Sequence, residues 1–415
     1  MVPNGWEIRQ LAEVCSKPIS YGIVQTGEVL KDGIPCARVV DLSKNEFDIS
    51  EMIKTTEEIH QSYKKTILEK GELMMALRGE IGLVRIVPDH LVGINITRGI
   101  ARLAPKNNVV DSECLLWIMR SNQVVNDLKR KAGGSALQEI SLTALRKVKV
   151  AVPPLPEQRK IANILGTWDN AISTTERLID NSKQQKKALM QQLLTGDHKG
   201  KRLLDDSGKP FDGEWEEVTL DLIASLTAGG TPSTKHPEYW GGDIPWMNSG
   251  DVNLKQVHSV EGRITELGLQ KSSTKEIPVN SVLIALAGQG KTRGTVAINR
   301  IKLCTNQSIA AIMPNAQKLD SNFLYFNLDD RYLELRAMST GDGGRGGLNL
   351  SILKSIKLKL PSLTEQQKIA SVLTNADQEI KLLAKQLADL KQEKKALMQQ
   401  LLTGKRRVKI TEDAA

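Results

Sequence analysis

Mostly apolar residues recur at helical heptad spacing in two long stretches of the chain. The first stretch runs from Ile161 to Leu193 and the second from Ile369 to Leu401, with the apolar positions stepping by four and three. Pro156 precedes the first stretch at a position that suits the first turn of a helix. The pattern predicts two long coiled-coil helices, and some 40 helical residues would span about 60 Å.

The two stretches are copies of one another. The segment Lys186 to Gly196 recurs without change as Lys394 to Gly404, and Glu157 to Leu165 matches Glu365 to Leu373 at the same offset of 208. Each copy ends on a glycine, where the C-terminal cap of a helix is expected. A period this long indicates two domains rather than a solenoid.

The front parts of the two copies match more faintly, beginning with Trp6-Glu and Trp215-Glu. Short apolar runs predict strands over 34–40, 72–77, 84–87, 100–103 and 148–152 in the first copy, and over 282–287, 296–298 and 309–313 in the second. One helix is predicted in each front part, over Cys114–Lys131 and Ser321–Met338. The expected fold class is therefore α+β, with mixed α/β domains.

The two predicted helices most simply pack on each other as an antiparallel pair. A parallel pair would need a linker that leads back along the whole coil, whereas short connections are the rule. The antiparallel arrangement relates the two front domains by a pseudo-two-fold axis. The expected boundaries are a first domain 1–152, a spacer helix 153–196, a linker 197–213, a second domain 214–360, a C-terminal spacer helix 361–404 and a charged, frayed tail 405–415.

Composition narrows the class of partner. The formal net charge of +9 and the pI near 9.2 suit a polyanion. The four cysteines lie far apart and the five histidines show no ligand spacing, so neither a metal site nor any cofactor is expected. No apolar run approaches the roughly 18 residues of a membrane span, and the N-terminus has no signal-peptide pattern, so we expect a cytoplasmic protein without a membrane partner.

Polar loops rich in Gly, Ser, Thr, Asn and basic residues lie between the predicted strands. Guanidinium, amide and hydroxyl groups can recognise base edges in the major groove, while lysines hold phosphates. Solvated turns have the same composition, so the loops alone leave both interpretations open. The candidate DNA-binding residues are Tyr21, Thr26, Arg78, Arg85, Asn95, Thr97, Arg98, Lys131, Ser135, Thr231, Ser233, Lys235, Gln289, Lys291, Thr292, Arg293, Asn306, Gln307 and Arg345.

Catalytic and nucleotide-binding motifs are not convincing. The segment Ala285 to Thr292 nearly spells a phosphate-binding P-loop, but Ala285 replaces the first glycine and the following residues are too β-branched for the helix that the motif needs. No Asp/Asn-Pro-Pro-Tyr/Phe methyltransferase motif, Ser/His/Asp triad or carboxylate pair is apparent. We therefore expect no catalytic activity from this chain alone.

Several motifs together resemble the specificity subunit of type I restriction-modification systems. They are the Trp-Glu starts, the Leu-x-Gly turns at Gly79 and Gly288, the Pro-Glu-Gln-Arg-Lys-Ile-Ala helix start and the Leu-Leu-Thr-Gly ends. The segment Gly229-Gly-Thr-Pro-Ser233, followed by Tyr239-Trp240 and Ile244-Pro-Trp246, is also typical of its target-recognition domains. The similarity extends from about Trp6 to Gly404.

This resemblance implies that each front domain recognises one half of a split site in double-stranded DNA. The paired helices would set the spacing and dock two methyltransferase subunits, with restriction subunits joining in the full complex. Glu157, Gln158, Glu365 and Gln366, in the shared helix starts, are the candidate partner-binding residues. The alternative is a coiled-coil scaffold, or an inhibitory adaptor, that binds the methyltransferase without recognising DNA.

The heptad seam gives a first prediction. Replacing Leu383 with Asp places a charge among apolar seam residues, and we expect the coil to splay or unfold, with a melting temperature lower by several degrees. Thermal unfolding and assembly with partner subunits measure this effect. Unchanged stability and unchanged assembly would contradict the packing of the two helices.

Overall fold

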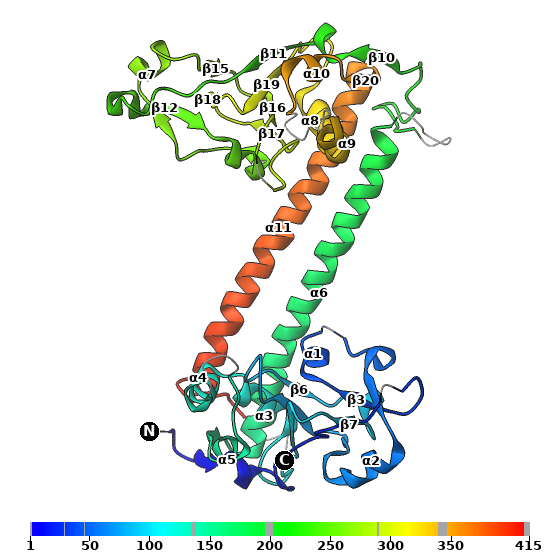
Figure 1. Ribbon diagram of the computed structural model, residues 1–415, viewed down its shortest axis with the longest axis vertical. Coiled ribbons are helices and arrows are strands. Elements are labelled where there is room, and N and C mark those ends of the chain that lie inside the picture. The colour runs from blue at the N-terminus through cyan, green and yellow to red at the C-terminus, as the bar shows by residue number, and fades with distance from the viewer. Residues whose placement is uncertain are drawn as a thin grey trace. The chain divides into compact units, whose positions relative to one another are not determined.

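A computed structural model describes residues 2–28, 30–44, 46–133, 138–195, 202–288, 290–338 and 347–410 (Figure 1). The chain divides into two compact units. The first unit comprises Met1–Glu176 and Lys385–Ala415, and the second comprises Arg177–Ala384. Each unit therefore contains one front domain, the first part of the helix that follows it and the last part of the other long helix.

The first front domain is mixed. Its strands are β1 (Glu7–Gln10), β2 (Ser20–Tyr21), β3 (Ile34–Ala37), β4 (Ile53–Thr55), β5 (Leu73–Ala76), β6 (Val84–Ile86), β7 (Asn95–Ile96), β8 (Ile100–Leu103) and β9 (Lys149–Val152). Its helices are α1 (Val39–Leu42), α2 (Glu57–Ser62), α3 (Ser112–Met119), α4 (Asn122–Lys131) and α5 (Leu142–Arg146), and the long helix α6 (Leu155–Leu193) follows. The 3₁₀ turn η3 (Lys64–Thr66) links α2 to β5.

The second front domain follows a similar order with additional strands, among them β13 (Gln256–Val257) and β15 (Glu276–Ile277). Its strands are β10 (Glu216–Thr219), β11 (Ala224–Ala228), β12 (Trp240–Met247), β13 (Gln256–Val257), β14 (Arg263–Ile264), β15 (Glu276–Ile277), β16 (Val282–Ala285), β17 (Val296–Asn299), β18 (Leu303–Thr305), β19 (Ile309–Pro314) and β20 (Lys357–Leu360). Its helices are α7 (Glu266–Gln270), α8 (Ser321–Asp330), α9 (Tyr332–Met338) and α10 (Leu350–Lys354), and the long helix α11 (Leu363–Leu401) follows.

The strand pairing is also duplicated. The first unit has sheets in the orders β2-β8-β5-β6, β4-β3-β7 and β1-β9. The second has β11-β19-β16-β17-β13, β14-β12-β18-β15 and β10-β20. Leu73 of β5 lies opposite Leu103 of β8, as Val282 of β16 lies opposite Ile312 of β19. This content, with the two long helices, confirms the expected fold class.

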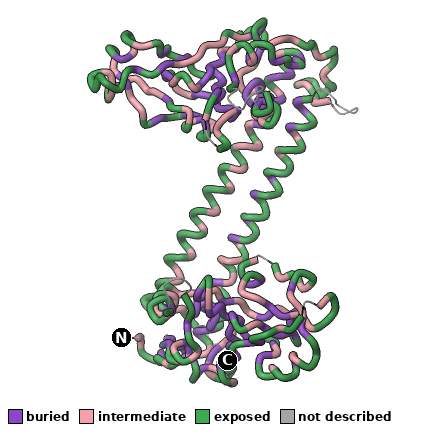
Figure 2. Tube along the Cα trace, viewed as in Figure 1, coloured by how far each residue is buried: buried purple, intermediate pink, exposed green. Residues whose placement is uncertain are grey.

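Each main core joins a front domain to parts of both long helices. In the first unit, Ile161 and Leu165 of α6 pack in one cluster with Leu401 of α11 and with buried residues of α3. The second unit has the equivalent cluster, in which Leu373 of α11 and Leu193 of α6 take part. Figure 2 shows the buried residues concentrated in the front domains, with buried positions recurring along the long helices.

The helices predicted over Cys114–Lys131 and Ser321–Met338 are each broken in two. In the first unit α3 ends before Arg120, and Ser121 begins α4 because its side-chain oxygen accepts a hydrogen bond from the backbone N–H of Val124. Sequence periodicity runs across such a break because both helices present apolar residues to the same core. The strand predicted over 34–40 is also too long, since α1 begins at Val39.

The two long helices are antiparallel within each unit. In the first unit, Asp169 of α6 pairs with Lys394 of α11, and Glu176, further along α6, pairs with Lys391, earlier on α11. In the second unit, Lys186 pairs with Asp377 at 2.5 Å. Seam residues such as Ile172 and Ile179 are buried, at 8% and 7% exposure. The predicted seam and antiparallel direction are therefore confirmed.

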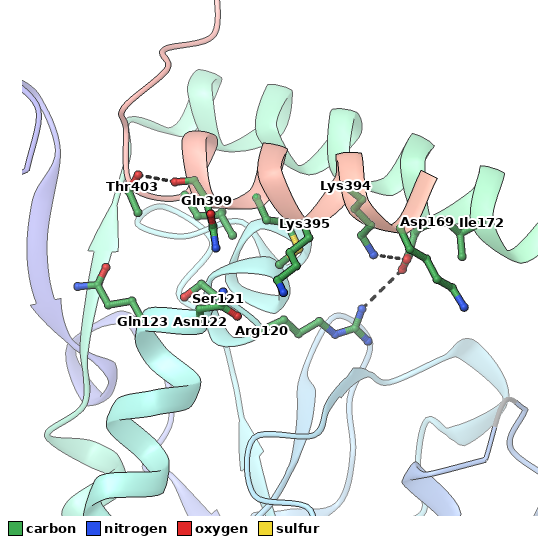
Figure 3. A pocket seen from close by; sticks show the side chains of 13 residues that line it. Arg120, Ser121, Asn122, Gln123, Asp169, Ile172, Lys394, Lys395, Gln399 and Thr403 are labelled. Atoms are coloured by element: carbon green, nitrogen blue, oxygen red, sulfur yellow. Dashed lines mark hydrogen bonds and ion pairs between the residues drawn. The ribbon is translucent and has the colours of Figure 1, made fainter. Parts of the chain in front are cut away.

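Lysine replaces an apolar residue at one equivalent seam position of each long helix. In the first unit the ammonium of Lys394 lies 4.5 Å from the ring centroid of Trp117 in α3 while it pairs with Asp169. Arg120 reaches the same carboxylate at 3.6 Å, and Figure 3 shows both cations directed at Asp169. Lys186 repeats the contact in the second unit, 5.2 Å from the ring centroid of Phe326. One side chain thus bonds the helix pair and the front domain together.

The first turn of each long helix is anchored by a buried glutamine. Gln158 accepts a hydrogen bond from the backbone N–H of Asp111 at 2.7 Å and donates to the carbonyls of Val109 and Pro153 at 2.9 and 2.7 Å. In the second unit, Gln366 makes the equivalent three bonds at 2.9, 3.1 and 3.0 Å, with the N–H of Asp320 and the carbonyls of Lys318 and Pro361. Each helix is therefore fixed to its domain by backbone contacts.

A buried glutamate precedes each of these glutamines and binds an arginine from a distant segment. Glu157 accepts two bonds from Arg407, at 2.7 and 2.8 Å, and one from Trp6 Nε1 at 3.0 Å. Glu365 accepts two bonds from Arg202, at 2.8 and 2.7 Å. The tail 405–415 was expected to be frayed, but in its described part, residues 405–410, Arg407 is fixed by this pair, because a buried carboxylate requires a partner.

The end of α11 also packs closely against other residues of the first unit. Gly404 has a φ of +68°, and a Cβ atom there would lie 2.2 Å from Pro3 Cγ. Glycine is needed both for the left-handed conformation and for space. The predicted role of Gly404 as a C-terminal cap is confirmed, and Gly196 lies outside the described residues.

The two arginine–glutamate clamps, Arg407 with Glu157 and Arg202 with Glu365, should differ in how much they stabilise the chain. Arg202→Met leaves the carboxylate of Glu365 buried without its partner, and we expect the free energy of unfolding to fall by about 3 kcal/mol. Arg407→Met should cost less, because Arg407 is 44% exposed against 16% for Arg202 and because Trp6 still donates to Glu157. Urea unfolding of the full chain measures both. Lys368→Met, which removes an exposed pair with Asp206, is the control, and equal losses in all three variants would contradict the clamp.

The structure also supplies the control for the seam variant Leu383→Asp. Leu383 is half-buried, whereas its neighbour Leu382 is 68% exposed. Leu382→Asp should leave the melting temperature of the chain unchanged, because its side chain already lies in water.

Candidate nucleic-acid interface

The loops singled out in the first front domain converge in the fold. Thr97 forms an isolated bridge with Ile23, and the backbone N–H of Arg98 donates to the carbonyl of Ile23 at 2.8 Å. The N–H of Leu77 donates to the carbonyl of Gly99 at 2.8 Å, which brings the turn at Arg78 to the same place. The loops after β2, after β5 and before β8 therefore form one polar surface.

Four of the candidate residues lie on or beside this surface with side chains that are exposed or half-buried, so a ligand can reach them. Tyr21 is 45% exposed at the end of β2, and Arg98 is exposed. Arg78 and Thr97 are half-buried. The guanidinium groups of Arg78 and Arg98 form no hydrogen bond or ion pair with any residue that the structure describes. Unpaired guanidinium groups are suited to guanine edges or phosphates.

Other candidates in the first domain serve the fold. Arg85 donates to the carbonyl of Leu42 at 3.1 Å and also to that of Lys44, and it covers the ring of Phe47. Asn95 is fully buried. The backbone carbonyl of Thr26 accepts from Thr55 Oγ1 at 2.9 Å, and Lys131 pairs with Asp127. Ser135 lies outside the described residues.

The second front domain brings equivalent loops together. The N–H of Gly230 donates to the carbonyl of Thr305 at 2.8 Å, and Thr231 Oγ1 donates to the side chain of Gln307. The N–H of Leu286 donates to the carbonyl of Ser308 at 2.8 Å, as Leu77 does to Gly99. Thr231 and Gln307 are exposed and Asn306 is half-buried.

The remaining candidates of this domain occupy two turns. Ser233 and Lys235 are exposed beyond the Gly-Gly turn. Lys291 is exposed and its carbonyl accepts from Tyr332 at 3.1 Å, while Thr292 and Arg293 are half-buried. The P-loop-like segment leads into strand β17, which is antiparallel to β16, so the helix that a P-loop requires is replaced by a hairpin. Gln289 and Arg345 lie outside the described residues.

The four candidate partner-binding residues are the buried helix anchors. Glu157, Gln158, Glu365 and Gln366 are at most 1% exposed, and each bonds residues of its own unit. A partner docked on the folded surface does not reach side chains this deeply buried. The structure therefore uses these residues to hold the helices, and a docking surface has to come from exposed neighbours.

A groove lies at an equivalent place in each unit, where the front domain meets its own long helix. The first has a volume of about 850 Å³ and is lined by Arg85, Trp117, Arg120 and Asp169 among others. The second, of about 440 Å³, is lined by Arg300, Phe326 and Asp377 among others. Burial lowers the pKa of Arg120, which Asp169 partly offsets, and burial also lowers the pKa of Arg300. Each groove thus carries a partly desolvated arginine.

Sequence reasoning missed a turn that reaches the surface beside Tyr21. Residues Tyr63, Lys64 and Lys65 at η3 line a cleft with Tyr21 and Ser20. The signal was present as an aromatic residue followed by two lysines, but it falls in the connection between α2 and β5 rather than in one of the glycine-rich loops. Among the described residues, no cluster of three His, Cys, Asp or Glu side chains could hold a metal ion. None of the described helices has the length and apolar character to cross a membrane.

The chain is similar to known proteins in both sequence and fold. The chain is 28% identical to the putative type I restriction enzyme MjaX specificity subunit of Methanocaldococcus jannaschii, over 98% of this chain and 95% of that protein. It is 26% identical to the MjaVIII specificity subunit of the same organism, over 74% and 73% of the two chains. The crystal structure of a type I restriction-modification S subunit from M. genitalium has the same fold, with a TM-score of 0.61 at 16% identity and 99% coverage of both chains.

A protein-family model matches both halves of the chain. The model described as the type I restriction modification DNA specificity domain matches residues 3–182 and again residues 212–392. These two matches take in both front domains and most of both long helices. The chain therefore belongs to the type I restriction modification DNA specificity family, carries two copies of its domain and serves in DNA sequence recognition.

Proposed function

We propose that the two front domains, taken as residues 1–152 and 214–360, each recognise one half of a split and asymmetric DNA site. The observation that carries this proposal is that equivalent loop positions hold different polar side chains. Thr97 and Arg98 of the first domain occupy the place that Asn306 and Gln307 occupy in the second. Arginine pairs well with guanine and glutamine or asparagine with adenine, so the two surfaces should prefer different sequences.

The paired helices, residues 153–196 and 361–404, would set the distance between the half-sites and dock two methyltransferase subunits. A partner that binds twice needs the same surface twice. The grooves beside Asp169 and Asp377 are candidates for such a surface, because they lie at equivalent places in the two units and carry an aspartate at the same position of the helix. Methyl transfer and cleavage would belong to the methyltransferase and restriction subunits, with no chemistry on this chain.

The test is to co-express the full chain with the methyltransferase subunit of its own system and to sequence the methylated adenines in the host DNA. We expect one asymmetric bipartite motif. Exchanging residues 1–152 for those of another specificity subunit should change one half of the motif and leave the other half intact. A palindromic motif would count against two different half-site readers.

Single substitutions test the two half-sites separately. Arg98→Ala should relax the sequence preference in one half-site, and Gln307→Ala should relax it in the other, with each lost base contact worth about 1–3 kcal/mol. Lys70→Ala, at an exposed lysine that pairs with Asp89, is the control and should leave the motif unchanged. A stable complex that methylates nothing would favour the scaffold or inhibitory role instead.

A further inference from the structure

A cleft of about 380 Å³ opens beside β2 in the first unit. Its walls carry two tyrosines, Tyr21 and Tyr63, and two lysines, Lys64 and Lys65. Tyr21 is 45% exposed and both lysines are exposed. Neither lysine forms an ion pair or a hydrogen bond with a residue that the structure describes, so two positive charges at its rim are uncompensated.

A buried polar network holds this cleft open. Thr66 is 2% exposed, and its Oγ1 lies 2.8 Å from Asn95 Oδ1 and 3.0 Å from the carbonyl oxygen of Tyr63, which share its one hydroxyl proton. Asn95 Nδ2 lies 3.4 Å from the carbonyl of Tyr63 and 3.5 Å from His60 Nδ1. Buried bonds of this kind rigidify the turn. Tyr63, Lys64 and Lys65 are therefore presented on a fixed frame, and Asn95 positions the turn without contacting a ligand itself.

The corresponding turn of the second unit is held by a different contact and carries different exposed side chains. Thr274 is buried like Thr66, and its hydroxyl donates to the carbonyl of Thr305 at 3.0 Å. Ser273 precedes it where Lys65 precedes Thr66, and Lys275 follows it. Lys275 donates to Thr227 Oγ1 at 3.1 Å, whereas Lys64 and Lys65 remain unpaired. The pair of unpaired lysines is therefore a feature of the turn in the first unit, and the turn of the second unit presents a different set of exposed residues.

We propose that the cleft at Tyr21, Tyr63, Lys64 and Lys65 binds a DNA strand at the half-site of the first domain. The two ammonium groups hold successive phosphates, since released counterions make such contacts favourable. The tyrosine rings pack against the sugar or base between them, as aromatic side chains do in nucleic-acid grooves. This inference rests on the proposed recognition of DNA by the front domains and adds residues that lie outside the glycine-rich loops.

The test measures the affinity of the full chain for a random-sequence DNA duplex by fluorescence anisotropy at several salt concentrations. Each phosphate contact contributes a slope of about −0.9 in the plot of log affinity against log salt. The double variant Lys64→Gln with Lys65→Gln should therefore lower the magnitude of the slope by about 1.8. Tyr21→Ala should weaken binding about fivefold without changing the slope, because it removes no charge.

The matched control is Lys70→Gln with Lys106→Gln, which removes the same charge from exposed lysines outside the cleft. We expect this control to keep the wild-type slope within about 0.5, because neither lysine would contact a phosphate. If the wild-type chain binds the duplex and the cleft variant behaves like the control, the cleft assignment is overturned and the recognition role stands. If the wild-type chain does not bind DNA at any salt concentration, the proposed recognition by the front domains fails, and the cleft assignment fails with it.

Discussion

The buried glutamine at the first turn of each long helix is the contact on which the rest of the structure depends. A helix of 39 residues magnifies any change of angle at its base, so the first turn must be fixed firmly. Gln158 and Gln366 provide this by satisfying one backbone donor and two backbone acceptors of their own domains. Losing such a side chain would leave one buried and two partly buried bonds to the backbone unmade, which explains why a polar residue occupies each position.

The adjacent glutamates extend the same constraint to segments distant in sequence. Arg407 follows the second long helix and Arg202 follows the first, yet each closes on the glutamate that begins the other helix. Bidentate pairing suits arginine better than lysine because the planar guanidinium matches a carboxylate. Since both members of each pair lie within one unit, the linker and the tail play the same structural part in their respective units.

The two units share their internal contacts and differ in their exposed loop side chains. Strand registers, anchors and the lysine–aspartate contacts of the helix seam are repeated from one unit to the other, whereas the exposed loop side chains differ. A substitution in the repeated contacts would change stability, whereas a substitution of an exposed loop side chain would leave the fold intact. This separation allows a recognition surface to vary without loss of the fold, because loops tolerate substitutions that cores and anchors do not.

The sequence by itself determined the duplication, the long helices, their seam and antiparallel pairing, and the mixed front domains. The long helices and their seam follow from periodicity, which is local, and Ile172 and Ile179 on that seam are buried. The antiparallel pairing follows from the rule that connections are short, and the duplication from repeated motifs. Only the tertiary structure decided which polar residues face outward. Asn95 meets Thr66, 29 residues away, and Glu157 meets Arg407, 250 residues away, so their burial cannot be deduced from their neighbours in sequence. Exposure of a loop side chain depends on contacts between distant segments, and composition alone does not encode those contacts.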